Sequence, residues 1–210
     1  HGSDGDARVA IGRGLAHDRP RGAGSGHHRR DRQHLSGKQV AQGVYWAVDH
    51  GARIITIGLN SGQSDYDQAT AVRYAHDKGV LVIASAGNTG TEALRYPASD
   101  QGVVPVAATN DSDVLYFWST RGSWIRLAAP GCQLVIDPEA GVGTLCGTSF
   151  TPAVVAGVAG LMLSLKPSLG PDEILDALVA TAVPVAGING GRIDPVAALA
   201  RVAPPSQTQL

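Results

Sequence analysis

From about residue 38 onward, short β-branched runs alternate with longer segments that have a helical pattern. The runs predict strands over 53–59, 80–85, 102–108 and 125–128, and the longer segments predict helices over 40–50, 65–78, 151–165, 171–182 and 195–202. Pro171 and the acidic residues after it mark the start of one helix, and Gly79 closes another. Strands that alternate with helices predict an α/β fold, with a mostly parallel sheet and helices on both faces.

The run from Gly147 to Gly157 places one serine, Ser149, between a glycine-rich loop and an apolar helix made of small residues. The free N–H groups and the positive end of the helix dipole lie beside a serine in this position. Such surroundings suit a nucleophile that must stand next to a developing oxyanion. A loop that merely caps a helix is the alternative interpretation.

This run, G-T-S-F-T-P-A-V-V-A-G, resembles the serine motif of the subtilisin-like serine proteases (subtilases, peptidase family S8), in which Ser149 matches the nucleophile. Pro152 follows the serine by three residues, whereas the family usually has proline at four; a first helical turn tolerates it. The resemblance covers about residues 39–202. It implies a three-layer α/β fold, incomplete at its N-terminal side, and a serine endopeptidase that works through an acyl-enzyme without a cofactor. The family often carries structural calcium, but this sequence shows no local carboxylate cluster with the spacing of a calcium loop, so we expect no metal site.

A second motif, V-I-A-S-A-G-N, ends at Asn88 and follows a β-branched run. In the resembled family this strand end forms one wall of the substrate side-chain pocket, which assigns Ser85, Ala86 and Gly87 to substrate binding. The family's asparagine here donates a side-chain hydrogen bond to the oxyanion, which assigns Asn88 to catalysis. Taken alone, the segment favours an ordinary turn after a strand, and the serine motif downstream is what favours the oxyanion role.

A third motif, around Gly58, Leu59 and Asn60, is similar to the family's strand that pairs with the backbone of an extended substrate. Glycine replaces the usual serine at position 58, and Asn60 with Ser61 replaces a pair of glycines. We therefore expect these three residues to bind substrate, with the bulk of Asn60 narrowing the cleft.

His1, followed by Gly2 and Ser3, resembles the start of the family's histidine motif, and its spacing from the segment that begins at Gly43 fits. A cloning remnant or a chance match is the alternative. The family's aspartate precedes its histidine, so the resemblance predicts that these 210 residues lack it and are a truncated, weakly active or inactive form. A non-catalytic relic, or a pseudoenzyme that binds peptides, is the competing hypothesis.

Residues 4–37 contain seven arginines and four of the seven histidines, without a visible strand or helix pattern. We expect an aberrant or disordered segment over 1–37, a peptidase domain over 38–203 and a tail over 204–210. A metal site through His27, His28 and His34 and an arginine-rich nucleic-acid tail are alternatives, but neither explains why a protease domain is interrupted. A shifted reading frame in a GC-rich gene is a third explanation.

Cys132 and Cys146 flank one short loop ahead of the serine motif, which predicts a disulfide in a secreted protein. Two reduced cysteines are the alternative, and a zinc site lacks two further ligands nearby.

A net charge of −1 argues against nucleic acid or a charged membrane as partner. The expected partner is a peptide or protein substrate of a monomer. A nucleotide-binding protein has little support, because no phosphate-cradling glycine motif follows a strand.

Overall fold

The computed structural model describes residues 8–11, 36–137 and 141–203. Its main sheet has seven strands in the order β1-β2-β3-β4-β5-β9-β8, parallel throughout except for the β8–β9 pair. These strands are β1 (Arg8–Ile11), β2 (Ala52–Ile57), β3 (Leu81–Ser85), β4 (Val103–Thr109), β5 (Leu127–Pro130), β8 (Val183–Pro184) and β9 (Gly191–Arg192). A separate antiparallel hairpin consists of β6 (Cys132–Asp137) and β7 (Gly141–Cys146).

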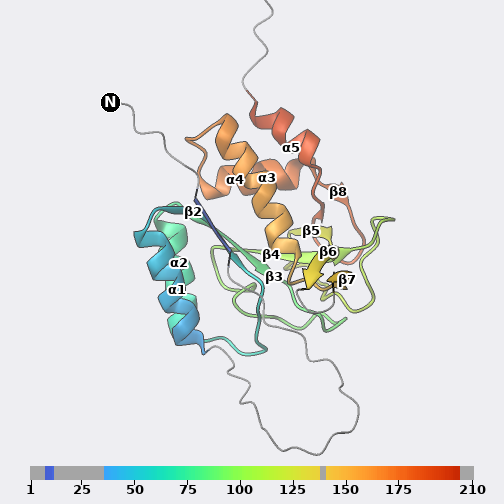
Figure 1. Cartoon of the computed structure of the whole chain (residues 1–210), viewed down its shortest axis with the longest axis horizontal. Coiled ribbons are helices and arrows are strands. Elements are labelled where there is room, and N and C mark those ends of the chain that lie inside the picture. Colours follow the sequence, from blue (N-terminus) through green and yellow to red (C-terminus); the bar gives the residue numbers. More distant parts are fainter. Residues whose placement is uncertain (1–7, 12–35, 138–140, 204–210) are drawn as a thin grey trace, which may run out of the picture.

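In the described part of the chain, five helices cover the two faces of the sheet, as Figure 1 shows. They are α1 (Gly37–Asp49), α2 (Tyr66–Asp77), α3 (Thr151–Leu165), α4 (Pro171–Thr181) and α5 (Pro195–Val202). Neighbouring residues of β2 serve opposite faces: Ile54 packs in the core with Met162 of α3, and Ile55 in the core with Val72 of α2. Both faces of the strands are buried, which explains their unbroken apolar sequences. The predicted α/β fold, with a mostly parallel sheet and helices on both faces, is confirmed.

Local signals in the sequence account for where the first two helices begin. The Ser36 hydroxyl accepts a hydrogen bond from the Gln39 N–H, and the Gln39 side chain accepts one from the Ser36 N–H, which is a capping box. Helix α1 therefore begins before residue 40, where the periodicity alone had placed it. The Asp65 side chain caps α2 by accepting a hydrogen bond from the Gln68 N–H.

Several features differ from the sequence-based expectation. Residues 8–11 form an edge strand that pairs in parallel with β2, although no strand was expected within 4–37. The Val9–Ile11 stretch is apolar but too short for an alternation to stand out among the arginines. The β6–β7 hairpin was expected only as a loop, and β5 lies two residues later than predicted. The remaining expectations for residues 1–7, 12–35 and 204–210 lie outside the described residues.

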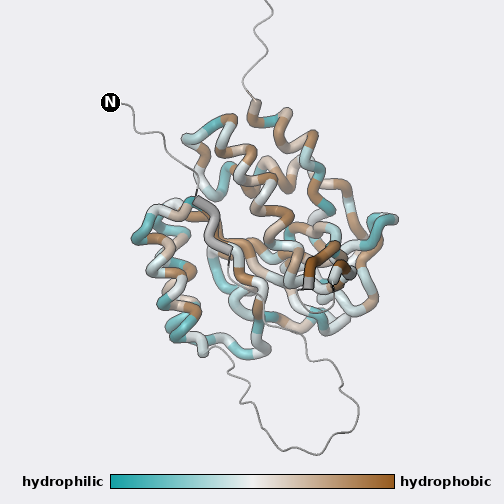
Figure 2. Tube along the Cα trace, in the orientation of Figure 1, coloured by the Kyte–Doolittle hydropathy of each residue, from teal (hydrophilic) through white to brown (hydrophobic). Residues whose placement is uncertain are grey.

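The β6–β7 hairpin stands apart from the main core. Figure 2 shows it as largely hydrophobic, yet Leu134 and Ile136 are 75% and 82% exposed. No helix in the described part of the chain has both the length and the hydrophobicity needed to cross a membrane.

Candidate active site

Ser149 lies in the short loop between β7 and α3, and its side chain is exposed. Helix α3 begins two residues later at Thr151, with Pro152 in its first turn, so the shifted proline is accommodated as expected. Within the described residues, no hydrogen bond uses the Ser149 hydroxyl or its N–H. Both groups are therefore available to a bound molecule at the positive end of the helix.

The loop that carries Ser149 is anchored on both sides. The Gly147 N–H donates to the Gly131 carbonyl oxygen at 2.8 Å, which ties the loop to the end of β5. The buried Thr151 hydroxyl lies 3.1 Å from the Val106 carbonyl oxygen of β4 and 2.9 Å from the Thr148 carbonyl oxygen. These contacts hold Ser149 above the carboxyl ends of the parallel strands.

The amide of Asn88 has one fixed orientation. Its Oδ1 atom accepts hydrogen bonds from the Thr148 backbone N–H at 3.0 Å and from the Thr148 hydroxyl at 2.8 Å. Because a backbone N–H can only donate, the atom that faces it must be the amide oxygen. The Nδ2 atom consequently faces away, on the side of Gly147, where no described residue accepts its hydrogen bond.

A line of side chains continues from Thr148 to a charged residue. The Thr148 hydroxyl gives its one proton to Asn88, so the Ser85 hydroxyl, 2.7 Å away, must donate to Thr148. Ser85 in turn accepts from the Asn60 Nδ2 atom at 3.2 Å, and the Asn60 Oδ1 atom accepts from the Arg95 Nε atom at 2.9 Å. We call these five residues, Arg95, Asn60, Ser85, Thr148 and Asn88, the donor chain. All its bonds run from the guanidinium toward the Asn88 amide, so each polarises the next.

The other predicted substrate-binding residues surround this line, with different exposures. Gly58 lies against the Ser149 backbone, since a Cβ atom on Gly58 would come within 3.0 Å of the Ser149 carbonyl oxygen. This close approach gives a reason for glycine at a position where serine is usual in the resembled family. The Leu59 side chain packs against the core between the sheet and α1–α2. The Ala86 side chain is fully buried beside Ala107, so only its backbone can meet a substrate.

His1 lies outside the described residues, so its position relative to Ser149 stays a prediction. The two histidines that the structure describes are engaged elsewhere. The His50 Nδ1 atom lies 2.7 Å from the Trp46 carbonyl oxygen, and the His76 Nε2 atom lies 3.3 Å from Asp172. Among the described residues, no group of three His, Cys, Asp or Glu side chains is arranged to hold a metal ion.

Comparison with known proteins shows the family of the chain. A sequence model described as the Subtilase family matches residues 26–202. The chain belongs to the subtilase family of serine proteases. The match includes Ser149, Asn88 and both predicted substrate-binding segments, and it begins inside the segment 1–37.

Individual subtilases share much of this sequence and fold. The chain is 40% identical over 126 residues to thermitase of Thermoactinomyces vulgaris, covering 60% of this chain and 45% of thermitase. It is 36% identical over 161 residues to the halolysin-like extracellular serine protease Nep of Natrialba magadii, covering 74% and 30%. The self-cleaved protease domain of PatA superposes with a TM-score of 0.76 at 31% identity, covering 83% and 71%. The chain spans less than half the length of these two curated relatives.

The predicted disulfide between Cys132 and Cys146 is present in this subtilase chain. The two cysteines are directly opposite one another in the β6–β7 register, at the end of the hairpin nearest Ser149. The bond therefore closes the hairpin at the point where its second strand leads into the nucleophile loop.

Two residues of the site were not identified from the sequence. Thr148 lies next to Ser149 in the serine motif, which is a signal that could have pointed to it. Its hydrogen bonds to Asn88 and Ser85, however, depend on the fold. Arg95 lies in an irregular loop, where no periodicity or motif pointed to it.

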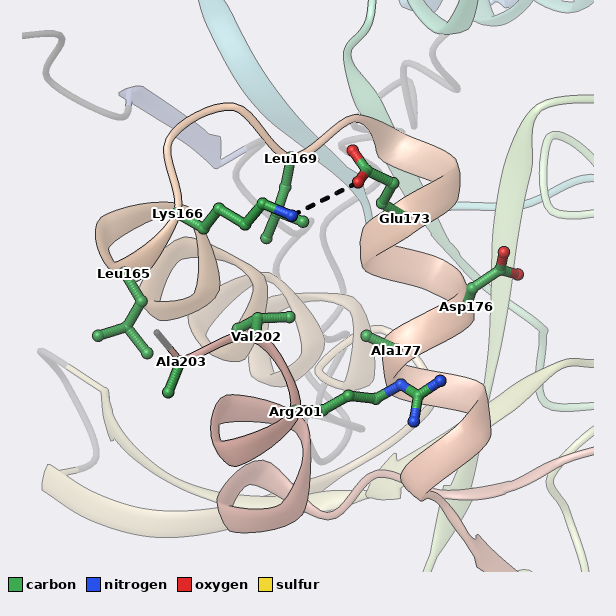
Figure 3. Close-up of a pocket in the computed structure, with 9 residues that line it drawn as sticks. All are labelled: Leu165, Lys166, Leu169, Glu173, Asp176, Ala177, Arg201, Val202 and Ala203. Atoms are coloured by element: carbon green, nitrogen blue, oxygen red, sulfur yellow. Dashed lines mark ion pairs between the residues drawn. The ribbon is translucent and has the colours of Figure 1, made fainter. Parts of the chain in front are cut away.

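One groove in the described part of this subtilase chain lies away from Ser149. It has a volume of about 610 Å³ and lies where α3 ends beside α4 and α5, with a 3.7 Å ion pair between Lys166 and Glu173 at its edge (Figure 3). Helix α3 has 15 residues, so at 1.5 Å per residue about 22 Å separates this end from the end beside Ser149. We assign the groove no part in the active site.

Proposed function

We propose that this chain carries the catalytic machinery of a serine endopeptidase in which Ser149 forms the acyl-enzyme. The observation that carries the proposal concerns two residues whose donors have no partner among the described residues. Ser149 is exposed, and Thr148 fixes the orientation of the Asn88 amide. The Ser149 hydroxyl attacks the scissile carbonyl carbon, and the carbonyl oxygen becomes an oxyanion. The Asn88 Nδ2 atom and the Ser149 N–H then donate to that oxygen.

The proton released by Ser149 must pass to a base and return to the leaving amine. The family motif that His1 matches assigns this role to His1, which takes the proton in the first step and donates it in the second. The acyl group is transferred to water in the same manner, which restores the Ser149 hydroxyl. No cofactor takes part in these steps.

The substrate is an extended segment of a peptide or protein. Its backbone pairs with Gly58, Leu59 and Asn60 at the end of β2, where main-chain hydrogen bonds supply affinity. The side chain that precedes the scissile bond then lies between this strand end and Ser85, Ala86 and Gly87. The contact of Gly58 with the Ser149 backbone supports this placement, because it brings the pairing edge next to the nucleophile.

We further propose that the protein acts outside the cell. The Cys132–Cys146 disulfide supports this, since such bonds persist in oxidising compartments. The names of two relatives, an extracellular protease and a cell wall-associated protease, agree with it. The expected monomeric state stays a prediction.

A fluorophosphonate probe, followed by mass spectrometry, tests the proposed nucleophile. We expect labelling at Ser149 and none in Ser149→Ala. Running the same titration on the 210 residues alone, and on the protein with any coding sequence that precedes them, tests the expectation that these residues alone are weakly active or inactive. If neither form is labelled although both bind peptide substrates, the protein is a peptide-binding pseudoenzyme and the catalytic proposal is wrong.

A further inference from the structure

The position of Arg95 is fixed by its backbone neighbours. Tyr96 and Ser61 exchange two backbone hydrogen bonds of 2.9 Å, which places Arg95 beside Asn60 at the end of β2. On the other side, the Arg95 side chain lies against Gly87 at the end of β3. A Cβ atom on Gly87 would come within 2.9 Å of the Arg95 Cγ atom, and the positive φ of Gly87, 97°, also disfavours a side chain there.

The guanidinium of Arg95 therefore lies between the two segments assigned to substrate binding. Its Nε atom donates to Asn60, and its Nη1 atom is 3.1 Å from the place where a Cβ atom on Gly62 would stand. Arg95 is only half-buried, and no carboxylate of the described residues lies within ion-pair distance of it. The neutral amide of Asn60 thus accepts from one of the five N–H donors of the guanidinium. The positive charge of the guanidinium has no partner among the described residues.

We propose that Arg95 makes this subtilase selective for an acidic side chain, Asp or Glu, on the residue that precedes the scissile bond. The inference rests on the proposed function, which places that side chain between the ends of β2 and β3. A planar guanidinium offers two parallel donors that match a carboxylate, and such charge-assisted bonds are stronger than neutral ones. A lysine or arginine side chain in the same place meets a like charge.

The nearby side chains favour a carboxylate over other ligands. Asn60 holds the guanidinium through Nε, which leaves the Nη atoms for a ligand. Ser85 has its hydroxyl proton committed to Thr148, and Gly58 and Gly87 contribute no side chain. The residues assigned to this part of the site from the sequence are mostly small or apolar, and Arg95 adds a cation to them.

Binding of four peptides to the 210-residue chain tests the proposal without requiring turnover. The peptides are fluorescent at the N-terminus, amidated at the C-terminus and differ only in their last residue: Glu, Gln, Leu or Lys. By fluorescence anisotropy we expect the Glu peptide to bind about tenfold more tightly than the Gln peptide, as for a charge-assisted hydrogen bond that is partly exposed. The Lys peptide should bind most weakly, and salt should narrow the Glu preference.

Variants separate recognition from a purely structural role of Arg95. Arg95→Gln should equalise the Glu and Gln peptides, and Arg95→Glu should favour the Lys peptide. Arg73→Gln, on the exposed face of α2, is the matched control and should leave the preference unchanged. Moving the glutamate one position toward the N-terminus of the peptide should remove its advantage. If Arg95→Gln fails to fold, the wild-type Glu preference and its salt dependence decide the question.

The possible failures are distinguishable. Equal binding of the Glu and Gln peptides by the wild-type chain overturns the role of Arg95 and leaves the proposed peptidase function standing. If none of the four peptides binds, the assignment of the two strand ends to substrate binding is wrong, and the selectivity proposal falls with it.

Discussion

Ser149 is flanked by two regions that hold their shape by different means. On one side, the donor chain links the ends of β2 and β3 to the nucleophile loop through side-chain hydrogen bonds, and its members Ser85 and Thr148 are fully buried. On the other side, the β6–β7 hairpin exposes apolar side chains and is closed by one disulfide.

The difference corresponds to what each region must control. Orienting an amide donor requires bonds with a defined direction, because a rotated Asn88 would present its oxygen to the oxyanion. The hairpin has only to hold the start of the nucleophile loop in place, and a covalent bond does this without fixing any donor. We therefore expect substitutions in the donor chain to change catalysis and substitutions in the hairpin to change stability.

The largest expected effect is that of Asn88→Ala in the catalytically competent protein. Turnover should fall by roughly a hundred- to a thousandfold, the range known from removing such a donor in subtilisin. The melting temperature should fall only modestly, because Asn88 itself is exposed but the buried Thr148 loses its acceptor. Steady-state kinetics and thermal melting measure the two quantities. Asn88→Asp, which keeps the size but loses the Nδ2 donor, should be similarly impaired. An unchanged turnover number would show that Asn88 is only a turn residue.

The hairpin should show the opposite result. Replacing Cys132 and Cys146 together by serine should lower the free energy of unfolding by about 3 kcal/mol in the chain-entropy description of a loop of this size. Urea denaturation measures this loss, and turnover per folded molecule should be nearly unchanged. Thiol counting on denatured, unreduced protein provides the control and should find no free thiol. A large fall in turnover of the folded double variant would mean that the hairpin also shapes the active site.

Thr148→Val should lower both turnover and stability, each by less than the variants above. The variant keeps the backbone bond to Asn88 but leaves the Gly87 N–H and the Ser85 hydroxyl without their buried partner. Such losses cost about 1–3 kcal/mol of stability, and turnover should fall less than in Asn88→Ala. Thr148→Ser, which restores the hydroxyl, should recover most of both quantities. Equal turnover in Thr148→Val and the wild type would show that the hydroxyl does not help to orient Asn88.

The smallest effect concerns Asp100, in the loop that also carries Arg95. Burial raises the pKa of the Asp100 carboxyl and the charge of Asp65 raises it further, while the Gln68 side chain partly offsets them. The folded state thus binds this proton more tightly than the unfolded state, so stability decreases as the pH rises through the unfolded pKa toward the folded one. Asp100→Asn should melt slightly above the wild type at neutral pH, and the difference should disappear below about pH 4. A difference that is the same at both pH values would argue against this cause.

The sequence predicted the part of the fold that depends on periodicity. The apolar strands and helix α3 could be located because buried elements have a recognisably apolar composition. Examples are the Val80–Ser85 run and the small residues after Ser149. Ser149 and Asn88 were identified because each lies at a strand or helix end within a recognisable motif. The backbone pairing that makes residues 8–11 a strand leaves little trace in so short a stretch.

The contacts that orient the site depend on residues far apart in the sequence. Asn60, Ser85 and Thr148 come together only because β2 and β3 are parallel neighbours and end at the same edge of the sheet. Arg95 joins them through a backbone bridge between two irregular segments. Local sequence patterns contain no information about these long-range contacts. From the sequence we expect Asn60 only to narrow the cleft, whereas in the structure it links Arg95 to Ser85 by hydrogen bonds.

The single direction of the donor chain has a consequence for how this protein can evolve. Each linking hydroxyl and amide already donates a hydrogen bond to the next member. No member can therefore change from donor to acceptor toward a neighbour unless that neighbour also changes. A substitution at one of these positions also affects its neighbours, and the effects of single changes should not add. In our proposal Arg95 determines the preferred cleavage site. A substitution of Arg95 should therefore also affect Asn88, the residue that stabilises the transition state. A new specificity that arises by replacement of Arg95 should be followed along this lineage by compensating changes in the rest of the set.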